Sequence, residues 1–171
     1  MIHSCIIDLD VFQSRTKGGG GVLSVSKEVL RAVVHPWHCD TFGHMNVRWY
    51  GHFFDDAAFH IWPVYWGSHK KMQDEFGLHT VTGRATTEFR LELSAGDLVI
   101  IDCSITRIGS KSCTFLERMR HVDTGVVHAT YLVSEVFFDP QTRKAVRIPD
   151  PIRAALEPLV SDSSVVELGV V

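Results

Sequence analysis

A carboxylate, an imidazole and a carboxamide follow one another closely in this chain, at Asp40, His44 and Asn46. The carboxylate of Asp40 can deliver oxygen to an acyl carbon, either by direct attack or by activating a water molecule. The side-chain donors of His44 and Asn46 can orient the acyl carbonyl group or the attacking water. These residue types are suited to hydrolysis of an activated acyl group, provided that further donors hold the developing oxyanion.

Spacing alone leaves other roles open for the same residues. Asp40 is equally well explained as a helix cap or a surface acid, and Asn46 could also cap a helix. A single histidine near the start of a helix, such as His44, is more often structural than catalytic. Cys39 is not expected to act as a nucleophile with Asp40, because adjacent side chains of an extended segment point to opposite faces.

The segment from Val47 to Trp62 has the apolar spacing of a largely buried helix. A helix that begins there would present free backbone amides near residues 45–47, and the positive end of its dipole, to a carbonyl oxygen. Pro63 is expected to break or kink this helix. Residues 68–76 are expected to add one or two further helical turns.

Most of the remaining chain has the pattern of β-strands. Strands are predicted at residues 28–34, 86–93, 98–108, 112–121 and 126–138. Because glycine and aspartate lie between the last four, successive strands are expected to pair antiparallel. In residues 98–108 apolar and polar side chains alternate, which predicts a sheet covered on one face only.

These elements predict one α+β domain, in which a curved antiparallel sheet of about five strands wraps around one long central helix. A short helix at residues 150–159 closes it. With 171 residues, the chain can bury one ordinary core but not two. A run of four glycines at residues 18–21 is expected to separate a flexible leader, residues 1–22, from a single domain at residues 23–171.

Composition excludes several classes of protein. A formal net charge of −3 and a pI near 6.3 argue against a general affinity for nucleic acid. No apolar run approaches the roughly 20 residues that a membrane-spanning helix needs. The four cysteines show neither the spacing of a zinc site nor the density of a disulfide scaffold. We therefore expect a cytoplasmic protein with reduced thiols, no metal, and no membrane or nucleic-acid partner.

The most specific motif of the chain is Asp40-Thr41-Phe42-Gly43-His44-Met45-Asn46, which runs on into Tyr50, Phe53, Phe54 and Ala57. It resembles the Asp-x-x-Gly-His-x-Asn turn and central helix of hotdog-fold acyl-CoA thioesterases of the 4-hydroxybenzoyl-CoA thioesterase type. The resemblance covers about residues 28–158, with weaker motifs at residues 94–97, 108–112, 139–143 and 148–149. It implies a hotdog fold and a thioester hydrolase.

The resemblance implies hydrolysis of an acyl-CoA to a free acid and CoA, with no cofactor because CoA is part of the substrate. Asp40 would be the nucleophile or general base, His44 and Asn46 its polar partners, and amides at Val47 the oxyanion hole. Residues implied in substrate binding are Phe42, Gly43, Tyr50, Phe54, Glu88, Arg107, Ser110 and Lys111. Arg143 and Lys144 are further candidates for the nucleotide end of CoA, and Glu88 for a second carboxylate reaching across to another subunit.

Relatives of this type are dimers or tetramers with the site between subunits, so a homodimer or homotetramer is implied here. An acyl carrier protein thioester could replace acyl-CoA as the substrate. Two other functions stay open. A hotdog dehydratase would use His44 and an acid to remove water from a 3-hydroxyacyl thioester. A non-catalytic acyl-CoA-binding protein would bind the ligand without turnover.

Overall fold

A computed structural model describes residues 26–161, so the predicted leader at residues 1–22 and both ends of the predicted domain lie outside the described residues. The helices are α1 (Val47–Trp66), α2 (His69–Phe76) and α3 (Asp150–Leu156), with single 3-10 turns at Pro36–His38 and Glu157–Leu159. The strands are β1 (Lys27–Val33), β2 (His79–Phe89), β3 (Leu98–Ile108), β4 (Ser112–His121), β5 (Val127–Asp139) and β6 (Lys144–Ala145).

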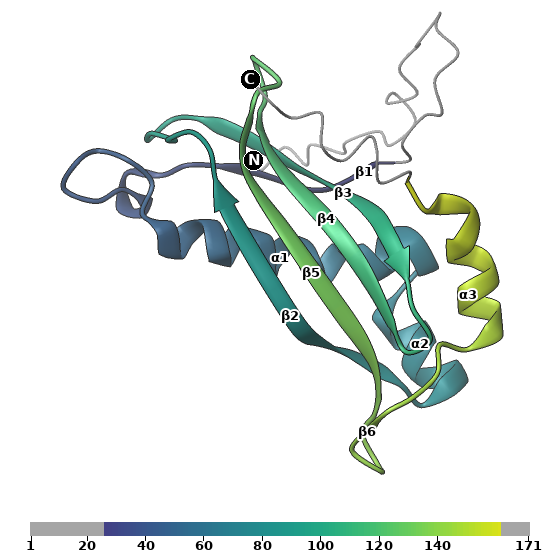
Figure 1. Cartoon of the computed structure of the whole chain (residues 1–171). Coiled ribbons are helices and arrows are strands. Elements are labelled where there is room, and N and C mark those ends of the chain that lie inside the picture. Colours follow the sequence, from purple (N-terminus) through teal and green to yellow (C-terminus); the bar gives the residue numbers. More distant parts are fainter. Residues whose placement is uncertain (1–25, 162–171) are drawn as a thin grey trace, which may run out of the picture.

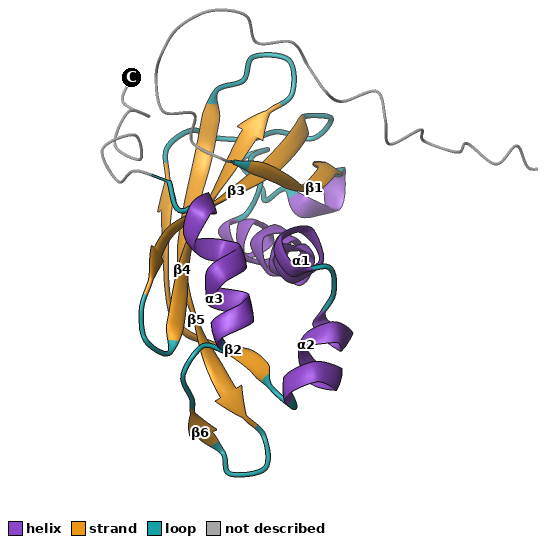
Figure 2. Ribbon diagram, turned by 90° about the vertical axis from the view of Figure 1, so that its right-hand side faces the viewer, coloured by secondary structure: helices purple, strands orange, loops and turns teal. Residues whose placement is uncertain are grey.

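The strands form one antiparallel sheet in the order β1-β3-β4-β5-β2, and the two-residue strand β6 pairs with β5. The sheet curves around α1, which lies along its inner face (Figures 1 and 2). Helices α2 and α3 lie near the end of α1 that is remote from its N-terminus (Figure 1). This arrangement confirms the α+β fold expected from the sequence, a curved antiparallel sheet around one long helix.

Strand β2 differs from its prediction in both position and pairing. It spans His79–Phe89, whereas the sequence pattern favoured residues 86–93. It pairs with β5 at the far edge of the sheet, so residues 94–97 form a turn but not the expected hairpin between β2 and β3. Residues 90–97 leave the sheet and cross its open end. The first residues of this segment, 90–92, form part of one wall of a pocket.

Helix α1 continues past Pro63 to Trp66, although proline was expected to break or kink it. A proline cannot donate the hydrogen bond that an ordinary residue makes to the carbonyl four positions earlier, here the carbonyl of Phe59. The ring Nε2 of His69 lies 2.9 Å from that carbonyl oxygen and donates to it instead. The replacement donor comes from α2, so the two helices are joined at this point.

The core forms where the apolar face of α1 meets the inner face of the sheet. Trp62 is almost completely buried, and its ring meets those of Phe115 and Phe137 edge-on, at 5.7 and 5.5 Å between centroids. Its indole nitrogen donates to Thr80 Oγ1 at 2.8 Å, so its one polar atom is satisfied. Packing of this kind fixes the helix on the sheet and thereby places its N-terminus.

The outer face of the sheet is more buried than alternation predicted. Asp102 and Ser104 point away from α1, as expected, but both are buried. Asp102 accepts hydrogen bonds from Ser26, Arg118 and Arg120. A buried carboxylate is tolerated when charged donors surround it, so this face is held by a polar network.

Candidate active site

The loop before α1 closes on itself and holds Asp40 at its surface. The Asp40 amide donates to the His44 carbonyl and the Gly43 amide donates to the Asp40 carbonyl, both at 3.0 Å. Gly43 has φ +84°, a conformation that costs a glycine little and other residues more. Asp40 Oδ1 accepts from the Phe42 amide at 2.8 Å. The other carboxylate oxygen, Oδ2, makes no hydrogen bond within the described chain, so it remains available for chemistry.

Two backbone hydrogen bonds fasten this loop to its surroundings. The Met45 amide donates to the Leu93 carbonyl at 2.7 Å, and the Asn46 amide donates to the His38 carbonyl at 2.9 Å. An isolated β-bridge also pairs His44 with Ser94. The loop that carries Asp40 is therefore anchored to the segment that crosses the open end of the sheet.

A buried histidine just before the loop packs against α1. His38 packs its ring against those of Trp49 and Phe53, at 4.5 and 5.2 Å between centroids. The His35 amide donates to His38 Nδ1 at 3.0 Å, so this nitrogen must be unprotonated. Burial, and secondarily the charge of His35, lowers the pKa of His38 and favours that neutral form. The neighbouring Cys39 thiol lies against the His35 carbonyl at 3.9 Å.

The first turn of α1 presents fewer free amides than the sequence suggested. Asn46 caps the helix, and its side-chain oxygen accepts from the Arg48 amide at 3.2 Å. The amides of Met45 and Asn46 are already bonded to the Leu93 and His38 carbonyls. Of the three amides proposed for an oxyanion hole, that of Val47 alone makes no hydrogen bond to another described residue.

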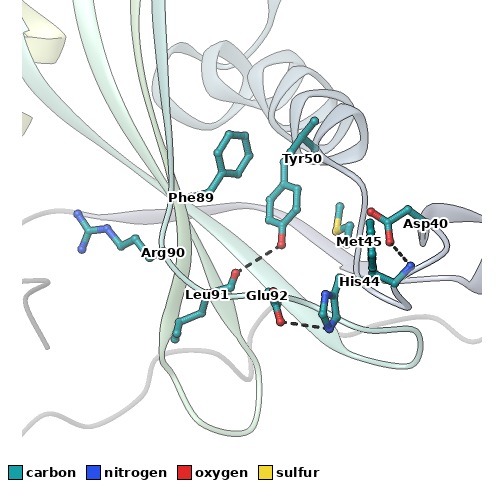
Figure 3. A pocket seen from close by; sticks show the side chains of 10 residues that line it. Asp40, His44, Met45, Tyr50, Phe89, Arg90, Leu91 and Glu92 are labelled. Atoms are coloured by element: carbon teal, nitrogen blue, oxygen red, sulfur yellow. Dashed lines mark hydrogen bonds and ion pairs between the residues drawn. The ribbon is translucent and has the colours of Figure 1, made fainter.

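A pocket of about 500 Å³ opens beside the loop. Its lining comes from three segments: the loop, the first turn of α1, and the end of β2 with the residues that follow it (Figure 3). The lining residues are Asp40, Phe42, His44, Met45, Val47, Tyr50, Phe89, Arg90, Leu91 and Glu92. Five of the residues singled out in the sequence thus meet at one pocket: Asp40, Phe42, His44, Val47 and Tyr50.

Two contacts across the pocket join its walls. His44 Nε2 lies 3.1 Å from Glu92 Oε2, so the imidazole has an acidic partner in the same chain (Figure 3). Tyr50 places its ring edge-on to that of Phe89, at 5.2 Å between centroids, and its hydroxyl donates to the Leu91 carbonyl at 3.5 Å. Burial is the main reason why the pKa of Tyr50 is raised. Tyr50 therefore stays a neutral hydrogen-bonding group at the pocket floor.

Four other predicted residues lie near the pocket without lining it. Gly43 shapes the loop and Asn46 caps the helix. Phe54 is fully buried and stacks on Tyr131 at 5.1 Å, which makes it a core residue one helical turn beyond the pocket. Glu88 faces the opposite side of the sheet from Phe89, where it contacts Arg90 and Thr130. A role for Glu88 across a subunit interface stays a prediction.

Three further predicted residues lie at the other end of the sheet in this chain. The pocket adjoins the end where Val99 pairs with His121, whereas the turn from β3 to β4 follows Ile108 (Figure 1). That turn and the end of β3 carry Arg107, Ser110 and Lys111. Lys111 Nζ donates to the Ala145 carbonyl at 2.8 Å. The candidates Arg143 and Lys144 lie at β6, near the same end. A contact of these residues with CoA would have to come from another subunit's substrate.

The structure adds one wall that sequence reasoning missed. Residues 89–92 and Met45 line the pocket, but the Arg90 side chain extends away from Asp40 and Tyr50 (Figure 3), and its guanidinium contacts Glu88 Oε2 at 3.4 Å. No motif marks these residues, because their approach to Asp40 depends on where β2 ends and on its pairing with β5. The signal available in the sequence was the unusual run of alternating charged and apolar residues after the strand.

The described residues show no group of three or more metal-binding side chains, and no helix within residues 26–161 is long and apolar enough to cross a membrane.

Comparison with solved structures identifies the fold. The protein SAV2348 from Staphylococcus aureus, solved in complex with CoA, matches with a TM-score of 0.69 and 18% identity over 81% of this chain and 87% of that chain. The probable thioesterase YbaW from Escherichia coli matches at 0.66 and 22%, over 77% and 98%. The 1,4-dihydroxy-2-naphthoyl-CoA thioesterase Slr0204 from Synechocystis matches at 0.66 and 14%, over 78% and 97%.

No curated protein sequence matches the chain. A family model does: the model of the thioesterase-like superfamily matches residues 34–156, which run from just after β1 through the loop, α1, α2 and strands β2 to β6 to the end of α3. This range includes every residue that lines the pocket. The chain accordingly belongs to the thioesterase-like superfamily of hotdog-fold thioester hydrolases.

Proposed function

We propose that this chain is an acyl-CoA thioesterase in which Asp40 is the catalytic carboxylate. The observation that carries the proposal is the position of Asp40: it lines the pocket beside the N-terminus of α1 and keeps one carboxylate oxygen unengaged. A thioester carbonyl in this pocket can meet a carboxylate on one side and the Val47 amide on the other. Nucleophile and oxyanion donor thus come from neighbouring positions.

The reaction converts a thioester and water into a carboxylic acid and a thiol. In one route Asp40 attacks the acyl carbon, the thiolate of CoA leaves and takes up a proton, and water then cleaves the mixed anhydride to regenerate Asp40. In the other route Asp40 accepts a proton from water as the water attacks, and that proton passes to the leaving thiolate. Both routes require the same carboxylate next to the same carbonyl.

The developing oxyanion needs donors at the start of α1. The Val47 amide is available there, and the helix dipole adds a positive potential. Asn46 is engaged as the helix cap and His44 is paired with Glu92. In this proposal those two residues hold the geometry of the site, and the Val47 amide contacts the reacting oxygen.

The proposed substrate class is supported mainly by one of the similar structures. Arg90 borders the pocket, and its guanidinium, which contacts Glu88 Oε2 at 3.4 Å, would have to turn from that carboxylate to meet a phosphate of CoA. The Staphylococcus protein of the same fold was solved with CoA bound. A thioester of an acyl carrier protein presents a similar phosphopantetheine arm, so the same pocket could take either donor. We take acyl-CoA as the substrate to test first.

We further propose that the active form is a homodimer or homotetramer. The pocket is surrounded by exposed apolar side chains, among them Phe42 (82% exposed), Val47 (63%) and Phe89 (52%). Strand β2, which ends at Phe89, forms one edge of the sheet. Exposed apolar patches and long strand edges of this kind are usually covered by a partner. A second copy placed along β2 would cover both.

A dehydratase is the second candidate, and one contact favours it. The pairing of His44 with Glu92 at 3.1 Å resembles the imidazole and carboxylate that acid–base removal of water requires. Both candidates would use the same pocket. They differ in product, because a dehydratase releases no free thiol.

The experiment that tests the proposal measures thiol release from short, long and aromatic acyl-CoAs by wild type and Asp40→Asn. We expect turnover of at least one thioester and a loss of about a hundredfold or more in kcat/KM for Asp40→Asn. His44→Gln is the matched comparison and should cost less. Two results together would favour the dehydratase over the hydrolase: full thiol release by Asp40→Asn, and loss of water elimination from 3-hydroxyacyl-CoA in His44→Gln. Binding of acyl-CoA without turnover would indicate a binding protein.

A further inference from the structure

A carboxyl group lies in the core between the sheet and α1, where an apolar side chain would be expected. Glu117, on β4, is fully buried on the inner face of the sheet. Its direct neighbours across the strands are Cys103 on β3 and Tyr131 on β5. Neither of its carboxyl oxygens has a hydrogen-bond partner among the described residues. Glu117 is therefore a buried polar group that the fold itself does not satisfy.

Such a group normally costs stability and is rarely kept without a use. Burial, with smaller contributions from the charges of Glu135 and Asp55, raises the pKa of Glu117 to about 9. The carboxyl group is therefore protonated at neutral pH. In that form it offers one hydrogen-bond donor and an acceptor oxygen without carrying a charge. A neutral hydroxyl or carbonyl oxygen is the kind of group that it can bind.

The strand register relates the position of this carboxyl to that of the pocket. Phe89, which lines the pocket, lies in one cross-strand row with Ala129, Met119 and Ile101. The next row on the same face, two residues along each strand, consists of Thr87, Tyr131, Glu117 and Cys103. Two residues of a strand span about 7 Å. Glu117 thus lies one row deeper than Phe89 and two strands across the sheet from it, with neighbouring strands about 4.8 Å apart.

The cross-strand row that contains Phe89 includes side chains that can make room for an acyl chain. Ala129 is small, and Phe89 is 52% exposed, so its ring can turn outward without leaving a void in the core. Met119 is unbranched and flexible. Beyond them, Tyr131 is held in place by its stacking on Phe54 at 5.1 Å. An acyl chain that enters between Tyr50 and Phe89 and displaces the Phe89 ring is directed toward Glu117.

We propose that the acyl site extends past Phe89 and Ala129 to Glu117, and that Glu117 selects acyl groups bearing a hydroxyl or carbonyl oxygen at that depth. The inference rests on the proposed thioesterase function and names a substrate class for the same pocket. An acyl group without such an oxygen leaves Glu117 unsatisfied, whereas a matching oxygen pairs with it. Sites built to pair with a substrate hydroxyl discriminate strongly against the analogue that lacks it.

The test uses pairs of CoA thioesters of equal chain length, one plain and one with a single hydroxyl placed beyond the β-carbon at successive positions. For one hydroxyl position, wild type should show a kcat/KM about tenfold or more above that of the plain thioester. Glu117→Leu should abolish this preference, so that the kcat/KM values of the hydroxylated and the plain thioester become equal. Glu117→Gln, which keeps a donor and an acceptor, should retain most of it.

Glu135→Gln is the matched control, because Glu135 also faces the core but already accepts a hydrogen bond from Thr82 at 2.7 Å. It should leave the preference unchanged. No preference in wild type at any hydroxyl position, or an equal preference in wild type and Glu117→Leu, would overturn the inference while leaving hydrolysis itself intact.

Binding separates this inference from the proposed function. Non-hydrolysable thioether analogues of the same pairs can be titrated calorimetrically into wild type and Glu117→Leu. A preference for the hydroxylated analogue that depends on Glu117, in a protein that cleaves no thioester, would support the inference and reject the hydrolase. Equal affinities for both analogues in both proteins would overturn the inference whether or not turnover is seen.

Discussion

Asp40 and Glu117 carry the same functional group in opposite surroundings. Asp40 lies on an exposed loop, where one oxygen accepts from the Phe42 amide and the other faces the pocket. Glu117 is fully buried, and its carboxyl oxygens have no hydrogen-bond partner among the described residues. Access to water and amide donors favours a carboxylate that can attack or take up a proton. Burial favours a protonated acid that can only form neutral hydrogen bonds.

The raised pKa of Glu117 makes the stability of the protein fall as pH rises. In the unfolded chain the carboxyl ionises near its ordinary pKa of 4.5, whereas in the folded protein it keeps its proton up to about 9. Between these values the folded state binds more protons, so unfolding becomes easier with rising pH, by at most about 1.4 kcal/mol per unit. We expect Glu117→Gln to be more stable than wild type at pH 8 and to have a flatter profile.

Urea unfolding of wild type and Glu117→Gln from pH 5 to pH 9 measures this difference directly. The difference in unfolding free energy between the two proteins should grow steadily over that range and be smallest at its acidic end. Glu135→Gln again serves as the comparison. Parallel profiles for wild type and Glu117→Gln would mean that Glu117 is already ionised or solvated in the folded protein.

The sequence identified most of the loop that lines the pocket but not the wall opposite to it. Asp40, His44 and Val47 could be found because their roles depend on local order: a polar turn followed by a helix start. Arg90 and Glu92 could not, since they reach the loop only through the long-range pairing of β2 with β5. Glu117 was also hidden, because a charged residue inside a strand pattern is normally assigned to the solvent face.

Among the elements, the helices were easier to predict than the order of the strands. The apolar spacing of α1 gave its start at Val47, where Asn46 caps it. The predicted end of α1 was wrong because a proline usually stops a helix. Here the missing amide donor of Pro63 is replaced by His69, which belongs to another element. The prediction placed strand β2 too far along the chain because residues 79–82 and 86–93 both suit a strand. Local preference also does not say which edge of the sheet a strand joins.

The junction of α1 with α2 gives a prediction about Pro63. If His69 replaces the hydrogen bond that Pro63 cannot make to the Phe59 carbonyl, His69→Ala should destabilise the protein by about 1 kcal/mol. In a Pro63→Ala background the new amide donates to Phe59 itself, so the same change should cost little. Urea unfolding of the two single variants and the double variant yields this coupling energy. Equal costs of His69→Ala in both backgrounds would show that the histidine acts elsewhere.

For the whole molecule, the open side of the pocket and the edge of the sheet coincide. The loop with Phe42, the start of α1 and the end of β2 lie together at one end of the sheet (Figures 1 and 3). The opposite edge strand, β1, is covered along its inner side by α1. The edge formed by β2 has no such cover, and its residues are largely exposed. A second chain at β2 would therefore enlarge the sheet and wall the pocket at the same time.

This arrangement predicts that assembly and activity depend on β2 together. Sedimentation of wild type should give a mass at least twice the 19.2 kDa of one chain. Val81→Lys places a charge on β2, where edge lysines oppose strand pairing, and should shift the protein toward monomer and lower thiol release in parallel. Leu132→Lys is the control, because Leu132 has the same 43% exposure as Val81 but lies on the inner strand β5. A monomeric wild type with full activity would show that one chain completes the site, whereas loss of assembly in Leu132→Lys alone would place the interface on the sheet's outer face.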